Sequence, residues 1–495
     1  MIQIRSSDSI VLKDITLLSV NSISKSILVV DLDGTLLRSD MLFETFWSAL
    51  SQDWRTPFRA SLALQNGKAG LKRFLSHASD VDVATLPYDP EVISYIKAWR
   101  EAGGYTALVT ASDAALASAV ANHLDLFDEV HGSEGDRNLK GPAKAAFLNE
   151  LYGAKGYAYM GDHEADLYVW KHAARAITVN ANKKLRNQAN SLGVETEHLL
   201  TASASINAYL KALRPHQWLK NILVFLPALA AHQYGAVTLL QCLMAFVCFS
   251  LVASSVYVLN DLIDLSADRA HPRKRARPFA SGTVPIAHGT WMAGGLLLAG
   301  MAIAAYLGGP FFTVMISYYL LTTGYSLMLK RKPIVDICAL ALLYTLRIVA
   351  GGSATGIPLS VWLLAFSIFF FFALAAVKRH AELVENAKRG KLSVKGRGYR
   401  VEDLPLISQI GISSGYVSIL VMALYLTSPN VAELYSQPAA LWGICLVLLY
   451  WITRVVMVTH RGEMHDDPVV YAARDRISLI CALIIFAFGV AGAML

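Results

Sequence analysis

The hydrophobic pattern divides the chain into two parts. Residues 1 to about 210 mix charged positions with short apolar runs, whereas residues from about 214 to 495 alternate long apolar stretches with short polar breaks. A helix needs roughly 20 mostly apolar residues to cross a bilayer. The second part therefore predicts nine transmembrane helices, at about 216–232, 237–259, 287–307, 310–329, 334–352, 360–377, 407–427, 438–458 and 476–495.

The polar breaks between these stretches alternate in charge. Those after the second, fourth, sixth and eighth stretches contain Lys and Arg, and those after the first, third, fifth and seventh contain neither. Cytoplasmic loops of membrane proteins carry an excess of Lys and Arg. The alternation predicts a multi-pass protein of the inner (cytoplasmic) membrane, with the N-terminal part in the cytoplasm and the C-terminus outside.

Short apolar runs in the first part are typical of β-strands. SILVVDLDGTLL, YTALVTAS, YAYMGDHEAD and AITVN each place apolar residues before a polar turn. Helical patterns between them predict a parallel sheet with crossover helices. Residues 40–90 have helical periodicity and predict a small cap. We expect an α/β domain at 1–195, a helical linker at 196–213 and an all-α membrane domain at 214–495.

Composition supports a membrane protein and excludes several other classes. The chain is 55% hydrophobic with a mean hydropathy of +0.43, which is unusual for a soluble protein of this length. The net charge of +7 comes from loops between apolar stretches, so we expect no nucleic-acid partner. All five cysteines lie in apolar stretches without metal-ligand spacing. The N-terminal segment lacks the apolar core and cleavage site of a signal peptide.

Candidate chemistry in the first part follows the predicted strands. Asp31 and Asp33 stand in Asp31-Leu32-Asp33-Gly34-Thr35, directly after the first apolar run. Ligands bind beyond the carboxyl ends of strands in open α/β sheets. A carboxylate there can attack phosphorus, and a second can exchange protons with the leaving group and water. Thr110, Lys140, Asp162 and Asp166 follow in later motifs, and carboxylates suit Mg²⁺.

These motifs, in this order, resemble the haloacid dehalogenase superfamily over about residues 25–182. The resemblance implies a Rossmann-like phosphatase in which Asp31 is the nucleophile and Asp33 the acid and base. Thr110 and Lys140 would hold the phosphate. Mg²⁺ would be bound by a set of four carboxylates: Asp31, Asp33, Asp162 and Asp166. The alternative is an inactive docking domain whose strand-end acids act only as turn residues and caps.

The second part carries a cluster of acids at the end of its second stretch. At about 100° per residue, Asn260, Asp261, Asp264 and Asp268 fall within an arc of about 100° on one helix face. Such a face can chelate Mg²⁺ that grips a diphosphate. A basic run at 271–278 follows, and its cations can clamp phosphate oxygens. The alternative for this run is a topology signal alone.

The spacing NDxxDxxxD resembles the aspartate-rich motif of the UbiA superfamily, over about residues 211–495. That resemblance implies a nine-helix bundle with a magnesium–diphosphate site. Members that use aromatic acceptors usually show a second acidic pair after the fourth span. Here Asp336 is the single acid of that segment, and the resemblance implies that it is a further Mg²⁺ ligand. The missing second acid disfavours a quinone or haem-type acceptor.

Other segments look like decaprenyl-phosphate phosphoribosyltransferases, at 214–221, 271–282, 329–336, 378–383 and 465–469. The resemblance implies transfer of phosphoribose from phosphoribosyl diphosphate to a polyprenyl phosphate. Arg347, deep in the fifth span, either lines the cavity or pairs structurally. The candidate substrate-binding residues are Lys220, Asn221, Arg269, Lys274, Arg277, Lys330, Arg347, Lys378 and Arg379.

The two parts together suggest one reaction sequence. The membrane domain would make a lipid-linked ribose 5-phosphate with Asp261 and Asp264 in its catalytic centre, and the phosphatase would remove the phosphate. One alternative is a conventional prenyltransferase with an aromatic acceptor. Another is a transporter or lipid-binding scaffold with a regulatory domain, but transporters place ionisable groups near the bilayer midplane. The sequence predicts no oligomeric state.

Overall fold

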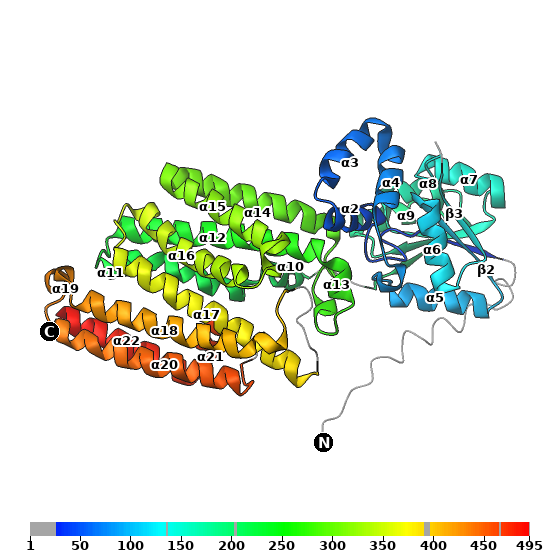
Figure 1. The fold of residues 1–495 in the computed structure, drawn as a ribbon. Coiled ribbons are helices and arrows are strands. Elements are labelled where there is room, and N and C mark those ends of the chain that lie inside the picture. Colours follow the sequence, from blue (N-terminus) through cyan, green and yellow to red (C-terminus); the bar gives the residue numbers. More distant parts are fainter. Residues whose placement is uncertain (1–25, 135–136, 202–204, 391–396, 465–466, 495) are drawn as a thin grey trace, which may run out of the picture. The chain divides into compact units, whose positions relative to one another are not determined.

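The computed structural model describes residues 26–134, 137–201, 205–390, 397–464 and 467–494. The N-terminal segment without signal-peptide features, and His465 and Asp466, therefore lie outside the described residues. The chain forms two compact units: unit 1 comprises 1–212 and 258–292, and unit 2 comprises 213–257 and 293–495. Figure 1 shows a mixed α/β part early in the chain and long helices later. The predicted α/β and helical parts are confirmed.

The sheet of unit 1 has six parallel strands in the order β3-β2-β1-β4-β5-β6. Four of the strands are the predicted apolar runs, while β3 and β6 were not predicted. The order reverses at β1, which pairs with both β2 and β4, and ligand sites lie at such a switch point. The strands are β1 Ile27–Val30, β2 Tyr105–Asp113, β3 Glu129–Ser133, β4 Tyr157–Gly161, β5 Arg175–Val179 and β6 Glu195–Leu199.

Helices cover both faces of this sheet. Leu28 and Val30 of β1 lie in one core with residues of α5 and α6, whereas Val29 lies in another core with residues of α7 and α9. Successive strand residues point to opposite faces, so a strand buried on both sides is apolar throughout. The crossover helices are α5 Pro90–Glu101, α6 Ala114–Leu124, α7 Pro142–Tyr152, α8 Leu167–Trp170 and α9 Lys183–Asn190.

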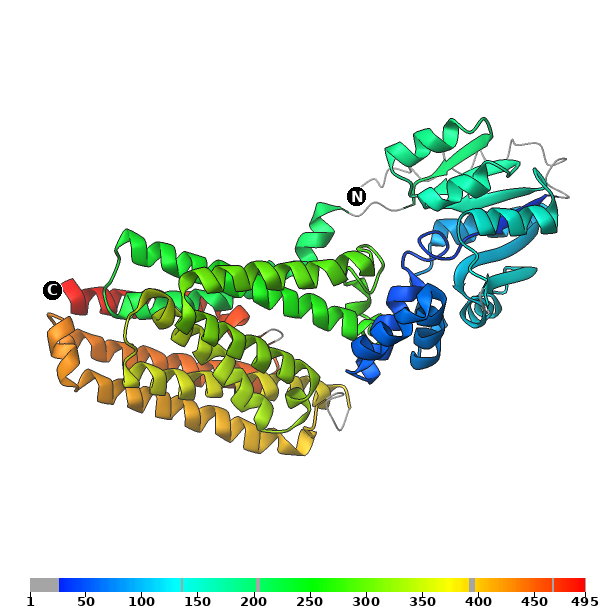
Figure 2. The ribbon, with the colours of Figure 1, turned by 90° about the horizontal axis from the view of Figure 1, so that it is seen from above.

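The segment after β1 forms a small cap. It contains α2 Met41–Gln52, α3 Thr56–Gln65, α4 Gly67–Ala78 and the 3-10 turn η1 Val83–Thr85. Ala49, Ala60 and Leu75 bring the three helices together in a small apolar core. The Asp40 carboxylate caps α2 by accepting a hydrogen bond from Leu42 N, which satisfies an amide that helix geometry leaves unpaired. The cap is coloured blue in Figure 2.

The predicted boundary at residue 195 is too early. Residues 195–199 form β6, which pairs in parallel with β5 along its whole length. The sequence ETEHL lacks an apolar run because this edge strand is only partly buried, and the linker interpretation followed from that polarity. Helix α10 Ile206–Leu213 then leads to the membrane domain, as expected for the second half of that segment.

Seven helices among the described residues are long and apolar enough to cross a membrane: α12 Ala236–Ile263, α14 Ile286–Leu307, α16 Val335–Thr355, α17 Val361–Lys388, α18 Leu404–Leu426, α20 Trp442–His460 and α22 Arg476–Met494. The predicted count of nine is not confirmed. Helix α15 Gly309–Leu327 occupies a predicted span but is not among the seven. The predicted span at 216–232 is a 3-10 segment, η3 Pro215–Phe225, and a short helix, α11 Leu226–Ala230.

Proline and packing explain the broken first span. Pro215 and Pro227 each stand at the start of a helical segment, where the missing amide hydrogen is tolerated. Inside one continuous α-helix, the same prolines would break a backbone hydrogen bond. Segment η3 packs on α16, and Gly351 makes the approach close. A Cβ at Gly351 would lie 2.1 Å from the Val224 carbonyl oxygen. Small residues commonly let helices approach closely in membranes.

We predict that Gly351→Ala lowers the thermal stability of the detergent-solubilised protein. The added methyl group must displace η3 from α16, and such overpacking typically costs about 1–3 kcal/mol. The matched control is Gly294→Ala in α14, because nothing lies within 4 Å of a Cβ there. Thermal unfolding followed by size-exclusion chromatography should show a lower midpoint for Gly351→Ala alone. Equal midpoints for the two variants would contradict the close contact.

Candidate functional site

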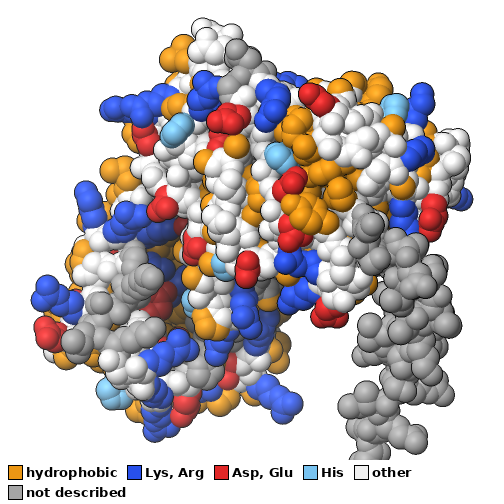
Figure 3. Space-filling model, turned by 90° about the vertical axis from the view of Figure 1, so that its right-hand side faces the viewer, with side chains coloured by type: hydrophobic (Ala, Val, Ile, Leu, Met, Phe, Trp, Pro, Cys, Tyr) orange, Lys and Arg blue, Asp and Glu red, His pale blue; other side chains and the backbone are white. Residues whose placement is uncertain are grey.

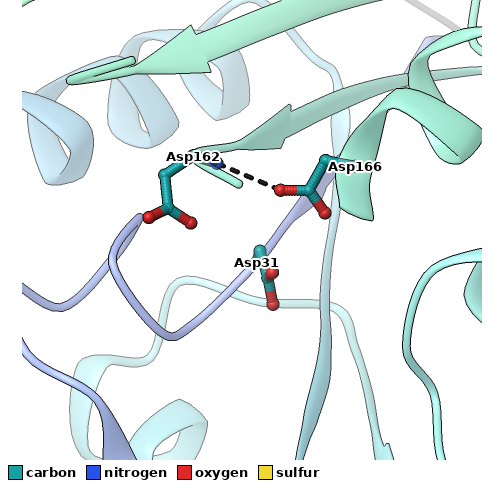
Figure 4. Close-up of side chains that lie close together, drawn as sticks. All are labelled: Asp31, Asp162 and Asp166. Carbon is teal, nitrogen blue, oxygen red and sulfur yellow. Dashed lines mark hydrogen bonds between the residues drawn. The ribbon is translucent and has the colours of Figure 1, made fainter. Parts of the chain in front are cut away.

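Three carboxylates meet beyond the carboxyl ends of β1 and β4. Asp31 follows β1, Asp162 follows β4, and Asp166 lies in the 3-10 turn η2 Glu164–Asp166 (Figure 4). One oxygen from each carboxylate lies within 4.8 Å of the others. Asp166 is held by Tyr159 Oη at 2.9 Å and by the amides of Asp162 and His163. The sheet topology thus assembles acids that are far apart in the sequence.

The electrostatics of this cluster suit a divalent cation. Burial raises the pKa of Asp162 well above its usual range, and the nearby charges of Asp166 and Asp31 raise it further. Burial and the Asp31 charge also raise the pKa of Asp166. A cation among these oxygens would remove that repulsion, and Mg²⁺ prefers oxygen ligands. The cluster fits Mg²⁺ with Asp31, Asp162 and Asp166 as candidate ligands.

Lys144 is the lysine that contacts the predicted nucleophile. Its Nζ lies 2.9 Å from Asp31 Oδ1 and donates to Tyr159 Oη at 2.9 Å, and its side chain is buried. The sequence interpretation chose Lys140, which is exposed and precedes α7. Lys144 lies in the first turn of α7, one turn further along the chain. A helix starting at Pro142 was the signal that could have identified it.

Asp33 lies apart from the carboxylate cluster and has its own partners. It accepts hydrogen bonds from Met41 N at 2.7 Å and Ser112 Oγ at 2.6 Å. Burial, reinforced by the charge of Asp40, raises the pKa of Asp33 to about 7. A carboxyl with this pKa can both give and take a proton near neutral pH. Its contacts support the acid–base prediction better than the metal-ligand prediction.

The loop after β1 needs a residue without a side chain at Gly34. Its φ is +72°, and a Cβ would lie 2.1 Å from Asp162 Oδ2. The missing side chain therefore lets the loop after β1 approach the acid after β4. Thr110 is fully buried, and its Oγ1 accepts a hydrogen bond from Ser112 N at 3.0 Å. Thr110 thus also orients the residue that donates to Asp33.

The cap contributes a lysine that the sequence interpretation missed. Lys72 of α4 donates a hydrogen bond from Nζ to the carbonyl oxygen of Ala111, between Thr110 and Ser112. Burial lowers the pKa of Lys72, although the charges of Asp33 and Asp40 oppose that shift. The α4 helix therefore brings a cation to the carboxyl end of β2.

The acid-rich segment of unit 1 keeps a helical repeat past the end of α12. Asp264 N donates to Asn260 O at 2.9 Å, and Asp268 N donates to Asp264 O at 2.8 Å. The repeat therefore continues into α13 Leu265–Arg269. This geometry is what the prediction of a shared acidic face required. Asp261 and Asp268 are buried at 3% and 1% exposure.

Cations lie directly against this acidic face. Arg277 Nη1 lies 3.0 Å from Asp261 Oδ1 and 2.6 Å from Asp268 Oδ2, so one guanidinium bridges two acids. Lys274 Nζ lies 3.9 Å from Asp268. On the face drawn in Figure 3, Lys and Arg side chains are interspersed with Asp and Glu. Charge pairing therefore explains the placement of these cations better than topology alone.

Arg269 has a different partner from the one expected. Its guanidinium donates to both carboxylate oxygens of Glu44, at 3.0 and 2.6 Å, and to the Ala280 carbonyl oxygen. The prediction assigned Arg269 to substrate binding, but in this structure Glu44 takes up its charge. Glu44 was not singled out from the sequence, because it stands in the helical cap and belongs to none of the motifs.

Two predicted cations of unit 2 share one carboxylate. Lys220 Nζ and Lys378 Nζ each lie 2.8 Å from Asp467 Oδ2. Burial alone would raise the pKa of Asp467, but these two ammonium groups hold it well below its usual range. Lys220 also lies over the Tyr344 ring at 5.6 Å. Asp467 lies in the segment 465–469 that resembles the phosphoribosyltransferases, but no role was predicted for it.

Arg347 is buried and fully engaged within unit 2. Its Nε donates to Asn221 Oδ1 at 2.9 Å, and its Nη2 donates to Tyr318 Oη at 3.2 Å. The guanidinium also lies near the rings of Phe249 and Tyr344. Between the two predicted roles, these contacts favour structural pairing. Asn221, which is predicted to bind substrate, accepts this hydrogen bond from Arg347 and donates to Ser250 of α12.

Asp336 and Arg379 form a buried pair in unit 2. The Asp336 carboxylate accepts hydrogen bonds from Arg379 Nε and Tyr399 Oη and is fully buried. Arg379 also contacts Glu382 at 2.6 Å. These contacts differ from the predicted roles of metal ligand and substrate-binding cation. Lys330 lies half-buried in the 3-10 turn η5 Leu329–Arg331.

Comparisons with known proteins match both parts of the chain. The model of the UbiA prenyltransferase family matches residues 221–479, and that of the haloacid dehalogenase-like hydrolases matches residues 28–171. The uncharacterized protein y4nM of Sinorhizobium fredii is 38% identical over 93% of this chain and 90% of its own length. The decaprenyl-phosphate phosphoribosyltransferase of Mycolicibacterium smegmatis is 32% identical over 56% of this chain and 90% of its own length.

A solved UbiA homolog from Archaeoglobus fulgidus, bound to GPP and Mg²⁺, aligns with 58% of this chain and 100% of its own, at 16% identity and a TM-score of 0.44. The chain belongs to the UbiA prenyltransferase family and carries an N-terminal haloacid dehalogenase-like domain. Both are enzyme domains. Together with the seven apolar helices, this membership identifies an integral membrane protein.

We predict that Lys144→Met lowers hydrolysis of p-nitrophenyl phosphate by about 100-fold or more, because the variant removes the cation that pairs with Asp31. Lys140→Met removes the same charge from an exposed position and should cost less than about tenfold. Steady-state kinetics of the purified protein with Mg²⁺ would measure both, with thermal unfolding as a check on folding. The reverse order of effects would favour the original assignment to Lys140.

Proposed function

We propose that the membrane domain transfers 5-phosphoribose from phosphoribosyl diphosphate to a polyprenyl phosphate. We further propose that the N-terminal domain removes the 5-phosphate from the product to leave polyprenyl-phosphoryl ribose. The observation that carries the proposal is the Arg277 bridge between Asp261 and Asp268. An acid face that is already paired with cations suits a substrate with several phosphates. Relatives named decaprenyl-phosphate phosphoribosyltransferase support the same substrate class.

Donor binding would use the acid face of unit 1. Asn260, Asp261, Asp264 and Asp268 would hold Mg²⁺, which would supply positive charge to the leaving diphosphate. Arg277 would then turn from the acids to phosphate oxygens. Guanidinium groups suit this exchange because they bind carboxylates and phosphates with the same fork geometry.

The paired lysines of unit 2 suit the binding of a further phosphate. Lys220 and Lys378 share a single carboxylate oxygen of Asp467, so this group of three carries a net positive charge. A phosphate dianion would be a stronger acceptor for two ammonium groups than one shared carboxylate oxygen. We assign these lysines to a phosphate group of the donor or of the lipid acceptor.

The transfer itself needs an oriented nucleophile and leaving group. A phosphate oxygen of the polyprenyl phosphate would attack the anomeric carbon of the ribose. The bond from that carbon to the diphosphate would break, and the diphosphate would leave with its electron pair. The cations of the acid-rich segment would stabilise the negative charge that develops on the diphosphate.

Removal of the 5-phosphate would proceed through an aspartyl-phosphate. An Asp31 oxygen would attack phosphorus while Asp33 gives its proton to the departing ribose 5-oxygen. Asp33 would then take a proton from the water that attacks the aspartyl-phosphate, which releases inorganic phosphate. Lys144 would orient Asp31 throughout. We place this step in the cytoplasm, with the protein in the inner membrane and the C-terminus outside.

We predict that Asp31→Asn accumulates the phosphorylated lipid. Purified protein would be incubated with phosphoribosyl diphosphate, polyprenyl phosphate and Mg²⁺, and the lipids would be analysed by mass spectrometry. Wild-type protein should give polyprenyl-phosphoryl ribose, whereas the variant lacks the nucleophile and should stop one phosphate earlier. Asp53→Asn, at a half-buried position of the cap away from the carboxylate cluster, is the control. An identical product from wild type and Asp31→Asn would contradict the coupled sequence.

We predict that Asp264→Ala abolishes Mg²⁺-dependent release of diphosphate from phosphoribosyl diphosphate. The change removes a candidate metal-binding carboxylate but leaves the phosphatase cluster intact. Hydrolysis of p-nitrophenyl phosphate should therefore stay within about twofold of wild type, since distant independent sites behave additively. Diphosphate release at the wild-type rate would exclude the acid face as the donor site.

A further inference from the structure

Unit 1 contains a contact between the cap helix α2 and the segment 264–290, which begins with Asp264 and Asp268 of the acid-rich motif. Its centre is the bidentate ion pair of Glu44 and Arg269, in which Arg269 Nη1 donates to Glu44 Oε2 and Arg269 Nη2 donates to Glu44 Oε1. The Glu44 and Arg269 side chains are only 3% and 6% exposed. Ser39 Oγ donates to Glu44 at 2.6 Å, and Arg269 Nε donates to the Ala280 carbonyl oxygen at 3.1 Å.

Burial of this pair makes it sensitive to separation. Removing one partner of a buried ion pair leaves an uncompensated charge, which is far more costly than losing an exposed pair. Ser39 and the Ala280 carbonyl group add further hydrogen bonds to the two members of the pair. The pair therefore stabilises one arrangement of α2 and the segment against others.

Neighbouring contacts extend the interface. Trp47 Nε1 donates to Thr290 Oγ1 at 3.1 Å, one helical turn along α2 from Glu44. Gly282 lies so close to the cap that a Cβ there would be 2.8 Å from Arg38 Cβ and 3.0 Å from Arg38 O. Three separate points of the segment thus contact the cap, at its start, middle and end.

We propose that α2 is an intrachain docking surface that binds the segment 264–290, so that the phosphatase cap and the acid-rich segment act as one body. Arg269 directly follows Asp268, whose carboxylate pairs with Arg277. A shift of α13 during donor binding would therefore act on the cap through Arg269, and a shift of the cap would act on α13. Such coupling is reciprocal. The docking surface itself does not depend on the proposed substrates.

Disulfide trapping tests the contact without any substrate. Trp47→Cys with Thr290→Cys should form a disulfide in membranes under mild oxidation, detected by mass spectrometry of the linked peptides. Phe58→Cys with Thr290→Cys is the control, because Phe58 is an exposed cap residue at 68% exposure. Equal yields from the two pairs would overturn the proposal.

Charge reversal tests the ion pair within the same trapped pair. Glu44→Arg and Arg269→Glu should each lower the disulfide yield about tenfold or more, and the double reversal should restore most of it. Glu91→Arg, at an exposed position of α5, should leave the yield unchanged. Failure of the double reversal to exceed the single variants would overturn the role of the pair.

A functional readout separates this proposal from the proposed function. Glu44→Gln should leave hydrolysis of p-nitrophenyl phosphate and release of diphosphate within about twofold of wild type, because Glu44 lies outside both clusters. In the coupled assay it should raise the phosphorylated lipid intermediate at least about threefold, because the cap no longer follows the acid-rich segment. If the wild-type protein forms the phosphorylated lipid and Glu44→Gln does not raise its level, the coupling is overturned. If no such lipid forms with any protein, the proposed function fails and the trapping result decides the docking surface.

Discussion

The structure depends on how buried negative charge is neutralised. Carboxylates are costly to bury, and each buried acid described above lies beside a cation or another hydrogen-bond donor. Asp31 pairs with Lys144, Asp467 with two lysines, and Asp336 with Arg379. In each case the ion pair also joins elements that are distant in sequence. These ion pairs therefore both neutralise buried charge and hold distant elements of the fold together.

The two groups of acids solve this problem differently. Asp31, Asp162 and Asp166 lie close together, and Lys144 pairs with Asp31. Burial and the neighbouring acids raise the pKa of Asp162 and of Asp166. A divalent cation among these oxygens would relieve the repulsion. On the acid-rich segment, by contrast, Arg277 already bridges two carboxylates. The first cluster has the geometry that a divalent cation would fit, and the second contains its own counter-charge.

Sequence reasoning predicted which acids lie close together better than it predicted their partners. Asp31, Asp162, Asp261 and Asp268 follow strands or share a helix face, and both relations can be derived from local periodicity. Lys144, Glu44 and Asp467 owe their roles to tertiary contacts, so no local pattern distinguishes them from other charged residues. The fold shows the same division. The apolar strands were predicted, but the polar edge strand β6 was not. The segment at 215–230 is apolar enough to predict one continuous span, although its prolines break it into two short helical pieces.

The Arg277 bridge has a consequence for the order in which ligands enter. A bare cation would have to displace a guanidinium from Asp261 and Asp268 and leave it without an anion in a mostly buried place. A cation that arrives already complexed with a diphosphate brings replacement oxygens for that guanidinium. If this face binds a metal and a diphosphate as proposed, Arg277 would disfavour binding of the metal alone and would favour entry of the metal and its polyanion as one species.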